Sequence, residues 1–386
     1  LQRLADSLQP ILDGHFAGLL AVHGEPGIGK SRLLHEVHQR LEARQPLQWF
    51  VWPAEGILKQ SLNPLQYFLR EYFNLAPDLT EDLNKARFEE VLEGLLAQLR
   101  RLPAPAPELA SELDRTRSFL GALGGGLRWE GSLYEQVEPR LRLENTLAAV
   151  KALILAECLR QPVVIQFEDA QWLDNDTLAF VRLMTRNVRQ FPLAVILTSR
   201  YRDDGSRHVL EVDEDVPQIA LDLNQLTPAG VQAMAAHTLG SPPSPELAAF
   251  LTEKTDGNPF FVEQLTLDLR ERGLLTAISA GGERRFALTS QAQASELPMS
   301  INAVLVARLD RLAAQVKALV QTAAVLGQEF EVWVLSQMLR DDSRLAERVR
   351  QAEAESIWSA LSETRYLFRH ALLRDAAYEM QVQARL

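Results

Sequence analysis

The eight residues from Gly24 to Ser31 constrain this chain more than any other segment. They read Gly-Glu-Pro-Gly-Ile-Gly-Lys-Ser and match the G-x-x-x-x-G-K-S pattern of a phosphate-binding loop. The uncharged run 19–22 before them predicts a buried strand, and apolar residues recur at helical spacing between Ser31 and Arg44. Strand, loop and helix therefore follow in the order that such a loop requires. A chance match on a glycine-rich turn would seldom lie between a strand and a helix, so we interpret the segment as a functional phosphate-binding loop.

Each residue type has a defined role in a loop of this kind. Glycines let backbone N–H groups turn toward the phosphates, and the N-terminus of the following helix adds a partial positive charge. Lys30 is expected to bind the β- and γ-phosphates, and the Ser31 hydroxyl is expected to hold Mg²⁺. We therefore predict ATP or ADP with Mg²⁺ as the ligand. The predicted nucleotide-binding residues of this segment are Gly24, Glu25, Pro26, Gly27, Ile28, Gly29, Lys30, Ser31 and Arg32.

A pair of acids ends the apolar run 162–169, which predicts a central parallel strand. Ligands of open α/β sheets bind at the carboxyl edge of the strands, where Glu168 and Asp169 would lie. One carboxylate would hold the metal shell and its neighbour would orient the attacking water, and the residues leave this division of labour open. A solvated acidic turn is the alternative, which the phosphate-binding loop upstream disfavours. We predict Ser31, Glu168 and Asp169 as metal-binding residues.

The apolar run 194–200 predicts another buried strand, which ends in Ser199 and Arg200. At the carboxyl edge of the same sheet, the Arg200 guanidinium would lie beside the phosphates and contact the γ-phosphate. The alternative for this arginine is an ordinary surface ion pair. We group Arg200 with Glu168 and Asp169 as the candidate catalytic residues.

The pattern along the chain predicts an α/β protein of three domains. Residues 1–224 are expected to form a P-loop NTPase domain with a parallel sheet, interrupted by a helical insertion over residues 54–143. Residues 225–273 read as amphipathic helices and predict an all-α lid domain. Residues 274–386 combine a ribbon-like segment with three helical units, which is typical of a winged-helix domain.

Proline and glycine clusters predict loops inside this scheme. In the insertion, the segments Pro103–Pro107 and Gly124–Gly126 are both predicted to be loops. The glycine triplet lacks a preceding strand and a lysine, so it is not expected to form a second phosphate site. In the winged-helix domain, Gly281 and Gly282 are predicted to interrupt an alternating ribbon over residues 274–297.

The charge balance disfavours nucleic acid as a partner. The 386-residue chain carries a formal net charge of −11, and residues 298–386 contain 11 Lys or Arg and 11 Asp or Glu. A winged helix that binds DNA normally has a basic face, so we expect this one to pack against protein.

Cysteine usage and hydropathy point to the cytoplasm. The single cysteine, Cys158, excludes an internal disulfide and lies on an apolar helix face, as expected for a buried thiol. No uncharged apolar run approaches the roughly 18 residues of a membrane span, and no signal peptide opens the sequence. Because the sequence begins at Leu1 without an initiator methionine, we expect it to be part of a longer protein.

With these residues, the chain resembles the STAND-class ATPases, which are AAA+ signalling NTPases related to the NB-ARC and NACHT switches. The bacterial members found beside cyclase, kinase or LuxR-type effectors are the most similar. The resemblance covers nearly the whole chain, and its first two motifs are specific when they occur together. The motifs that carry it are Gly24–Leu34, Phe167–Asp174, Thr198–Arg200, Asp256–Phe261 and Phe368–Leu372.

The resemblance implies roles for residues 257–259, for Arg200 and for His370. It makes residues 257–259 the turn of the lid domain, with Pro259 packed beside the adenine, and it makes Arg200 the first sensor. It also implies that His370 contacts the β-phosphate of ADP, as the last histidine of NB-ARC switches does. From the residues alone, a space-filling histidine in the winged-helix core explains His370 equally well.

The resemblance further implies a regulatory switch. ADP would hold the domains closed, and ATP with a partner would open them for oligomerisation, with slow hydrolysis between the two states. The chain departs from the family at two points: the Gly-Arg-Glu box before the first helix is absent, and the acid pair is Glu-Asp where many relatives have Asp-Asp or Asp-Glu. Relatives usually continue into C-terminal helical repeats that sense a protein partner, and this sequence contains none.

Two other classes of function stay open. An AAA+ loader or motor ATPase that acts on nucleic acid also joins a phosphate-binding loop to a winged helix, and a DNA-binding regulator would use the winged helix directly. The acidic balance of the chain disfavours both. Salt-dependent DNA binding by the purified chain would reverse this ranking.

Overall fold

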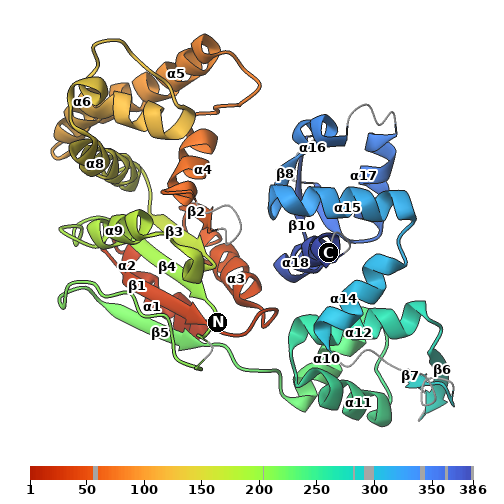
Figure 1. The fold of residues 1–386 in the computed structure, drawn as a ribbon. Helices are drawn as coiled ribbons and strands as arrows, with labels where there is room; N and C mark the ends of the chain where they lie inside the picture. The colour runs from red at the N-terminus through yellow and green to blue at the C-terminus, as the bar shows by residue number, and fades with distance from the viewer. Residues whose placement is uncertain are drawn as a thin grey trace. The chain divides into compact units, whose positions relative to one another are not determined.

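The computed structural model describes residues 1–54, 60–202, 204–280, 283–290, 300–339, 344–360 and 364–383. Gly281 and Gly282 of the predicted ribbon lie outside these residues. The chain divides into two compact units, whose elements are labelled in Figure 1. The first unit contains Leu1–Glu25 and Lys30–Leu223, and the second contains Pro26–Gly29 together with Asn224–Leu386. The predicted boundary between a lid domain and a winged-helix domain stays a prediction.

The first unit is an α/β unit in which helices alternate with strands along the chain. Its strands are β1 (Gly18–His23), β2 (Gln48–Pro53), β3 (Val163–Glu168), β4 (Leu193–Ser199) and β5 (Gln218–Asp222). Its helices are α1 (Gln2–Ser7), α2 (Gln9–Leu12), α3 (Lys30–Glu42), α4 (Asn63–Tyr72), α5 (Glu81–Leu99), α6 (Ala106–Gly125), α7 (Leu133–Gln136), α8 (Pro139–Cys158), the 3₁₀ turn η1 (Ala170–Trp172) and α9 (Asn175–Met184).

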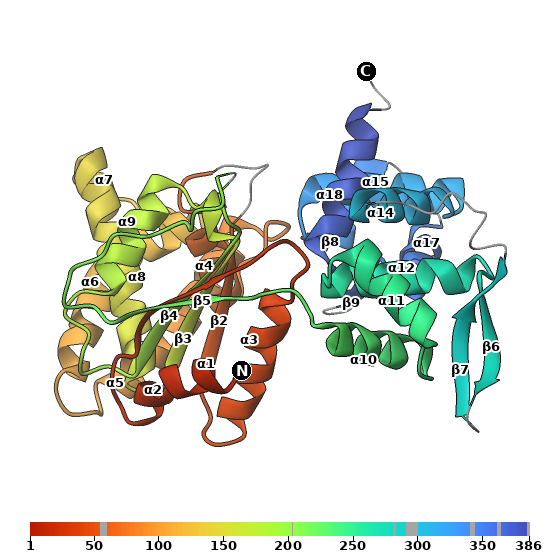
Figure 2. The same ribbon diagram turned by 90° about the horizontal axis from the view of Figure 1, so that it is seen from below.

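The five strands form one parallel sheet in the order β2-β3-β4-β1-β5, which Figures 1 and 2 show from two sides. In register, Gly18 of β1 pairs with Ala194 of β4, and Gln48 of β2 pairs with Val163 of β3. Because all pairs are parallel, the carboxyl ends of β1, β3 and β4 meet at the same edge. The predicted P-loop NTPase sheet is therefore present, and its functional edge collects the segments that the sequence singled out.

Both faces of the sheet are buried because its central strands are apolar at successive positions. On one face, Leu20 and Val22 of β1 share a core with Leu34 and Val37 of α3. On the other face, Leu19 belongs to a second core that includes α8, α9 and the inserted helices. A continuous apolar strand with helices on both sides is the pattern expected of a parallel sheet.

The inserted helices α4 to α7 share one apolar core with the sheet rather than forming a separate body: α4 contacts β2, and α6 packs on α4 and α8. Phe68 of α4, Phe88 of α5 and Phe119 of α6 are buried in the same core as Phe167 of β3. The insertion therefore shares its stabilising apolar contacts with the nucleotide domain, and its helices can be placed relative to the sheet.

The loop predicted at the glycine triplet is wrong, because α6 continues to Gly125 and only Gly126 leaves the helix, at φ +66°. A Cβ atom at Gly124 would lie 2.9 Å from the Cβ of Leu69 on α4. Glycine is therefore needed there for the close approach of two helices, and Gly126 supplies the left-handed residue that ends one of them.

The second unit contains further helices, a hairpin and a small sheet. Its helices are α10 (Pro228–Leu239), α11 (Pro245–Thr255), α12 (Pro259–Glu271), α14 (Ile301–Asp310), α15 (Ala314–Leu326), α16 (Val332–Leu339), α17 (Leu345–Ala354) and α18 (Ala371–Gln383). Its strands are β6 (Leu275–Ala280), β7 (Glu283–Leu288), β8 (Glu329–Glu331), β9 (Trp358–Ala360) and β10 (Arg365–Phe368).

Two apolar cores stabilise this unit. The first joins α10, α11 and α12 to the antiparallel hairpin β6–β7, in which Leu275 pairs with Leu288. The second joins α14 to α18 with the antiparallel sheet β8-β10-β9, and it buries Trp358 and Phe368 completely. Phe260 of α12 belongs to the second core, so the helices before and after the hairpin are packed together. Within the described parts of the chain, no helix has the length and apolar character needed to cross a membrane.

Candidate nucleotide-binding site

The loop after β1 has the backbone geometry that a phosphate cradle needs. Gly27 and Gly29 adopt φ +78° and φ +100°, a region that residues with a Cβ rarely adopt. α3 begins at Lys30, directly behind the glycines. The N–H groups of its first turn have no partner inside the helix and carry the positive end of the helix dipole. The predicted loop residues therefore stand at an anion-binding helix terminus.

The Lys30 ammonium is held inside this loop. Its Nζ donates to the carbonyl oxygens of Gly24 at 2.8 Å and Glu25 at 3.2 Å. Burial lowers the pKa of Lys30 below its ordinary value, although the negative charge of Asp169 acts in the opposite direction. A partly desolvated cation of this kind gains more from a phosphate partner than a solvated one would.

Ser31 and Glu168 meet across the carboxyl edge of the sheet. The Ser31 Oγ donates to Oε1 of Glu168 at 2.9 Å, which joins the start of α3 to the end of β3. Burial raises the pKa of Glu168 above its ordinary value, and the hydrogen bonds from Ser31 and Gln166 oppose this rise. A hydroxyl and a carboxylate oxygen are the hard donors that Mg²⁺ prefers. These two side chains therefore fit a shared magnesium shell completed by phosphate and water.

Asp169 follows β3 in a left-handed conformation, at φ +52°. Its backbone N–H donates to Oγ1 of Thr198 on β4 at 3.2 Å. Its carboxylate accepts a hydrogen bond from Nε2 of Gln171 at 2.9 Å and lies 3.9 Å from Nε of Arg200. The structure thus brings Asp169 and Arg200 together, as the sequence predicted for this edge, while their catalytic roles stay predictions.

Gln171 is a residue that the sequence analysis did not single out. Its Oε1 accepts hydrogen bonds from the Ser199 hydroxyl and from the backbone N–H of Arg200, both at 3.2 Å. Its amide nitrogen holds Asp169. The side chain therefore ties the turn after β3 to the end of β4, and its place two residues after the acid pair is the only signal that the sequence offers.

A second unrecognised residue, Gln166, lies inside β3 and orients Glu168. Its Nε2 donates to Oε1 of Glu168 at 2.9 Å, and its Oε1 accepts from Nε1 of Trp49 on β2 at 2.8 Å. Because the indole can only donate, it fixes which end of the amide faces the carboxylate. A buried glutamine in an otherwise apolar strand was the signal for this role.

Gln166→Leu is expected to weaken metal binding to the nucleotide-loaded protein. The substitution removes one hydrogen bond to a buried carboxylate, and such bonds contribute about 1.5–3 kcal/mol, so Mn²⁺ affinity should fall roughly tenfold or more. The measurement is the dissociation constant of Mn²⁺ in the presence of ADP, followed by electron paramagnetic resonance. Trp49→Phe keeps the amide but not its fixed orientation, so its effect should be smaller. Unchanged Mn²⁺ affinity in Gln166→Leu would exclude the orienting role.

The N-terminal turn of α12 lies against Pro26–Gly29, which belongs to the same unit. Nδ2 of Asn258 donates to the Pro26 carbonyl at 2.8 Å, and the N–H of Phe260 donates to the Gly27 carbonyl at 3.2 Å. Asn258 also caps α12 by accepting from Phe261, which places Pro259 at the first helical position. The predicted contact of Pro259 with adenine stays a prediction.

His370 precedes α18 and packs on Phe260, with the ring centroids 4.0 Å apart. It is half-buried, and its Nε2 lies 3.9 Å from Oε2 of Glu263. Burial, together with the charges of Arg308 and Arg369, lowers the pKa of His370 to about 4. The imidazole is therefore neutral near pH 7 and can donate one N–H and accept one hydrogen bond. The predicted contact with the ADP phosphate stays a prediction.

A phosphate-binding loop between the strand and helix of an open parallel sheet, with acids at the end of a neighbouring strand, defines a P-loop nucleoside triphosphatase. Residues 1–197 match the family model described as the AAA ATPase domain. The match spans just over half of the chain, so the chain belongs to this family. The prediction of a P-loop ATPase is confirmed at this level, and nucleotide binding follows from the family.

The chain is also similar to individual proteins. An uncharacterized protein of Rhizobium meliloti (strain 1021) is 25% identical over 198 residues, which cover 50% of this chain and 18% of that protein. A STAND protein with a tetratricopeptide repeat sensor from Pyrococcus horikoshii has 13% identity and a TM-score of 0.48, over 97% of this chain and 42% of the other. Orc1 of Aeropyrum pernix, solved in complex with DNA, has 11% identity and a TM-score of 0.42, over 100% and 92% of the two chains.

The chain thus spans 18% of the curated relative and 42% of the Pyrococcus horikoshii STAND chain.

Proposed function

We propose that this chain is the nucleotide-dependent switch module of a larger signalling protein of the STAND class. It would bind ATP, hydrolyse it slowly, and alternate between an ADP-bound closed form and an ATP-bound form that is open and oligomeric. The residue motifs and the AAA ATPase family support this proposal. Residues 225–273 would be the lid domain, residues 274–386 the winged-helix domain, and the cytoplasm the location. A protein partner would act through repeats outside this chain.

The proposed chemistry follows from the contacts at the edge of the sheet. Lys30 would pair with the β- and γ-phosphates, and Arg200 would contact the γ-phosphate. Ser31 and Glu168 would hold Mg²⁺, since their side chains are hydrogen-bonded to each other. The metal, when bound, neutralises developing charge on the phosphates. Asp169 would orient the attacking water, because its carboxylate is held separately by Gln171.

The observation that carries the switch is the double contact of Phe260. Its N–H donates to the Gly27 carbonyl, and its ring packs on the His370 ring. A nucleotide that changes the backbone of the glycine loop would therefore change the contacts of α12, on which His370 rests. Phe260 thus connects the phosphate-binding loop, through its backbone, to the histidine that the resemblance implicates in ADP binding, through its ring.

His370→Ala is expected to weaken ADP binding more than ATP binding and to shift the protein toward the oligomeric form. A hydrogen bond to a charged phosphate contributes about 1.5–3 kcal/mol, which corresponds to roughly a tenfold or larger loss of ADP affinity. The measurements are the two affinities by titration calorimetry and the oligomeric state by light scattering. His237→Ala, at an exposed position of α10, is the matched control. Equal losses for the two nucleotides, or no loss, would reduce His370 to a packing residue.

A further inference from the structure

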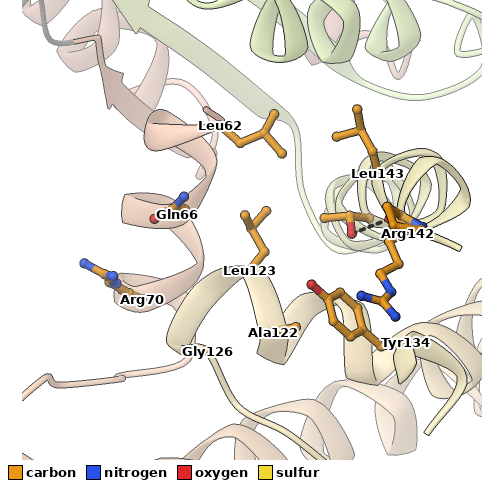
Figure 3. Close-up of a pocket in the computed structure, with 11 residues that line it drawn as sticks. Leu62, Gln66, Arg70, Ala122, Leu123, Gly126, Tyr134, Arg142 and Leu143 are labelled. Carbon is orange, nitrogen blue, oxygen red and sulfur yellow. Dashed lines mark hydrogen bonds between the residues drawn. The ribbon is translucent and has the colours of Figure 1, made fainter. Parts of the chain in front are cut away.

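A cavity of about 500 Å³, open to solvent, lies among the helices α4, α6, α7 and α8 of the first unit (Figure 3). This volume is within the range of small-molecule sites. The apolar side chains of Leu62, Leu123 and Leu143 line it from three different helices or their ends. The cavity lies away from the phosphate-binding loop, and nothing in the proposed ATPase chemistry uses it.

One wall of the cavity is polar and presents unused hydrogen-bond donors. Nε of Arg142 donates to the Val137 carbonyl at 2.9 Å, and its Nη2 donates to the Glu135 carbonyl at 3.3 Å. Its remaining N–H groups have no partner among the described residues. The same is true of the Tyr134 hydroxyl, whose ring lies 5.2 Å from the Arg142 guanidinium. Figure 3 shows the hydroxyl directed toward the interior, between Leu123 and Arg142.

The electrostatic character of the cavity is positive. Among the described residues that line it, the charged ones are Arg70 and Arg142, and none is a carboxylate. Pro139, at the first position of α8, also lines it, and no side chain caps that helix. The positive end of the α8 dipole adds to the field of the arginines, and the charge of Glu138, the N-cap residue of the same helix, opposes it. The N–H groups of Arg142 that donate to no protein acceptor carry positive charge, so an anion would form charge-assisted hydrogen bonds with them.

We propose that this cavity binds a small amphipathic organic anion. A carboxylate or sulfonate group would accept hydrogen bonds from Arg142 and Tyr134, and a hydrocarbon body would contact Leu62, Leu123 and Leu143. The cavity would then be a second ligand site in this chain, separate from the nucleotide and selective for ligands that are both apolar and negatively charged.

The test uses 1-anilinonaphthalene-8-sulfonate, an aromatic sulfonate whose fluorescence rises in apolar surroundings, titrated into the whole chain. We expect saturable binding at one site per chain, displaced by octanoate and not by octylamine, which has a similar hydrocarbon and the opposite charge. Arg142→Gln should weaken probe binding about tenfold or more, because a charge-assisted hydrogen bond is lost. Tyr134→Phe should weaken it several-fold, and Leu143→Trp should abolish it by filling the space.

Arg140→Gln is the matched control, since this arginine lies on the same helix with its side chain 90% exposed. It should bind the probe as the unmodified chain does. Tyr134→Phe keeps the ring and its contacts, so it tests the site even if Arg142→Gln disturbs the fold of α7. Probe affinities of Tyr134→Phe and Leu143→Trp equal to that of Arg140→Gln would overturn the proposal. Equal displacement by octylamine and octanoate would overturn it as well.

Discussion

Lys30→Ala is expected to abolish binding of both ATP and ADP. The ammonium is held inside the glycine loop by the carbonyls of Gly24 and Glu25, and it is the cation that we propose to bind the β- and γ-phosphates. Bound nucleotide stabilises the native state by about 2.7 kcal/mol at a hundredfold excess over Kd. The variant should therefore lose the rise in Tm that nucleotide produces in the unmodified chain.

The measurement is the Tm of each protein with and without ADP or ATP at saturating Mg²⁺. Lys254→Ala, at a lysine of α11 whose ammonium pairs with Glu253, is a matched control and should keep the full rise. The Tm without nucleotide separates a loss of binding from a loss of folding. A normal rise in Lys30→Ala would show that the loop does not bind phosphate.

The double variant Glu168→Gln/Asp169→Asn, in which both carboxylates are neutralised, is expected to retain nucleotide binding and to lose most of its hydrolysis. Both substitutions keep the shape of the side chains, so the Ser31 hydroxyl retains an acceptor. In the proposed mechanism the carboxylates act through metal and water, and removal of a general base typically lowers the rate by roughly 10²–10⁴-fold. Steady-state phosphate release and calorimetric ADP affinity are the two measurements. Hydrolysis at the unmodified rate would place the metal and water ligands elsewhere.

The two single variants separate the roles of the acids. If Glu168 holds the metal, Glu168→Gln should raise the Mg²⁺ concentration needed for half-maximal hydrolysis. Asp169→Asn should instead lower kcat at saturating Mg²⁺, because orientation of the water is lost. Glu214→Gln, at an exposed carboxylate of the same unit, should behave as the unmodified chain does. The opposite pattern would exchange the two roles.

The parts of the site that lie in one continuous segment could be predicted from the sequence. The phosphate-binding loop is such a segment, because Gly27, Gly29 and Lys30 act through backbone conformation and a helix start that the neighbouring residues determine. The acid pair could be predicted because an apolar strand directs its last residues to the ligand edge. The parallel sheet could also be predicted from the continuous apolar runs, since buried strands separated by helices leave few other arrangements.

Contacts that depend on the order of the strands could not be predicted. The hydrogen bond between Trp49 and Gln166 exists because β2 lies beside β3 in register, and nothing near either residue specifies this neighbour. Gln171 likewise connects two strands, because it bonds to Asp169 directly after β3 and to Ser199 at the end of β4. Gly124 was misinterpreted because close helix packing and a flexible loop both favour glycine. Only the tertiary contact with Leu69 shows that this glycine allows close packing of two helices and does not form a loop.

The position of β1 in the sheet has a consequence for the order in which the chain can acquire its structure. Among the five strands of this sheet β1 comes first in the chain, yet both of its neighbours, β4 and β5, come after the inserted helices. During synthesis, β1 therefore has two open edges until residues 193–199 and 218–222 have emerged, and pairing over such separations is slow. Exposed strand edges invite association between nascent chains. Of these five strands, the one that leads into the phosphate-binding loop is thus translated first and is among the last to be paired on both edges.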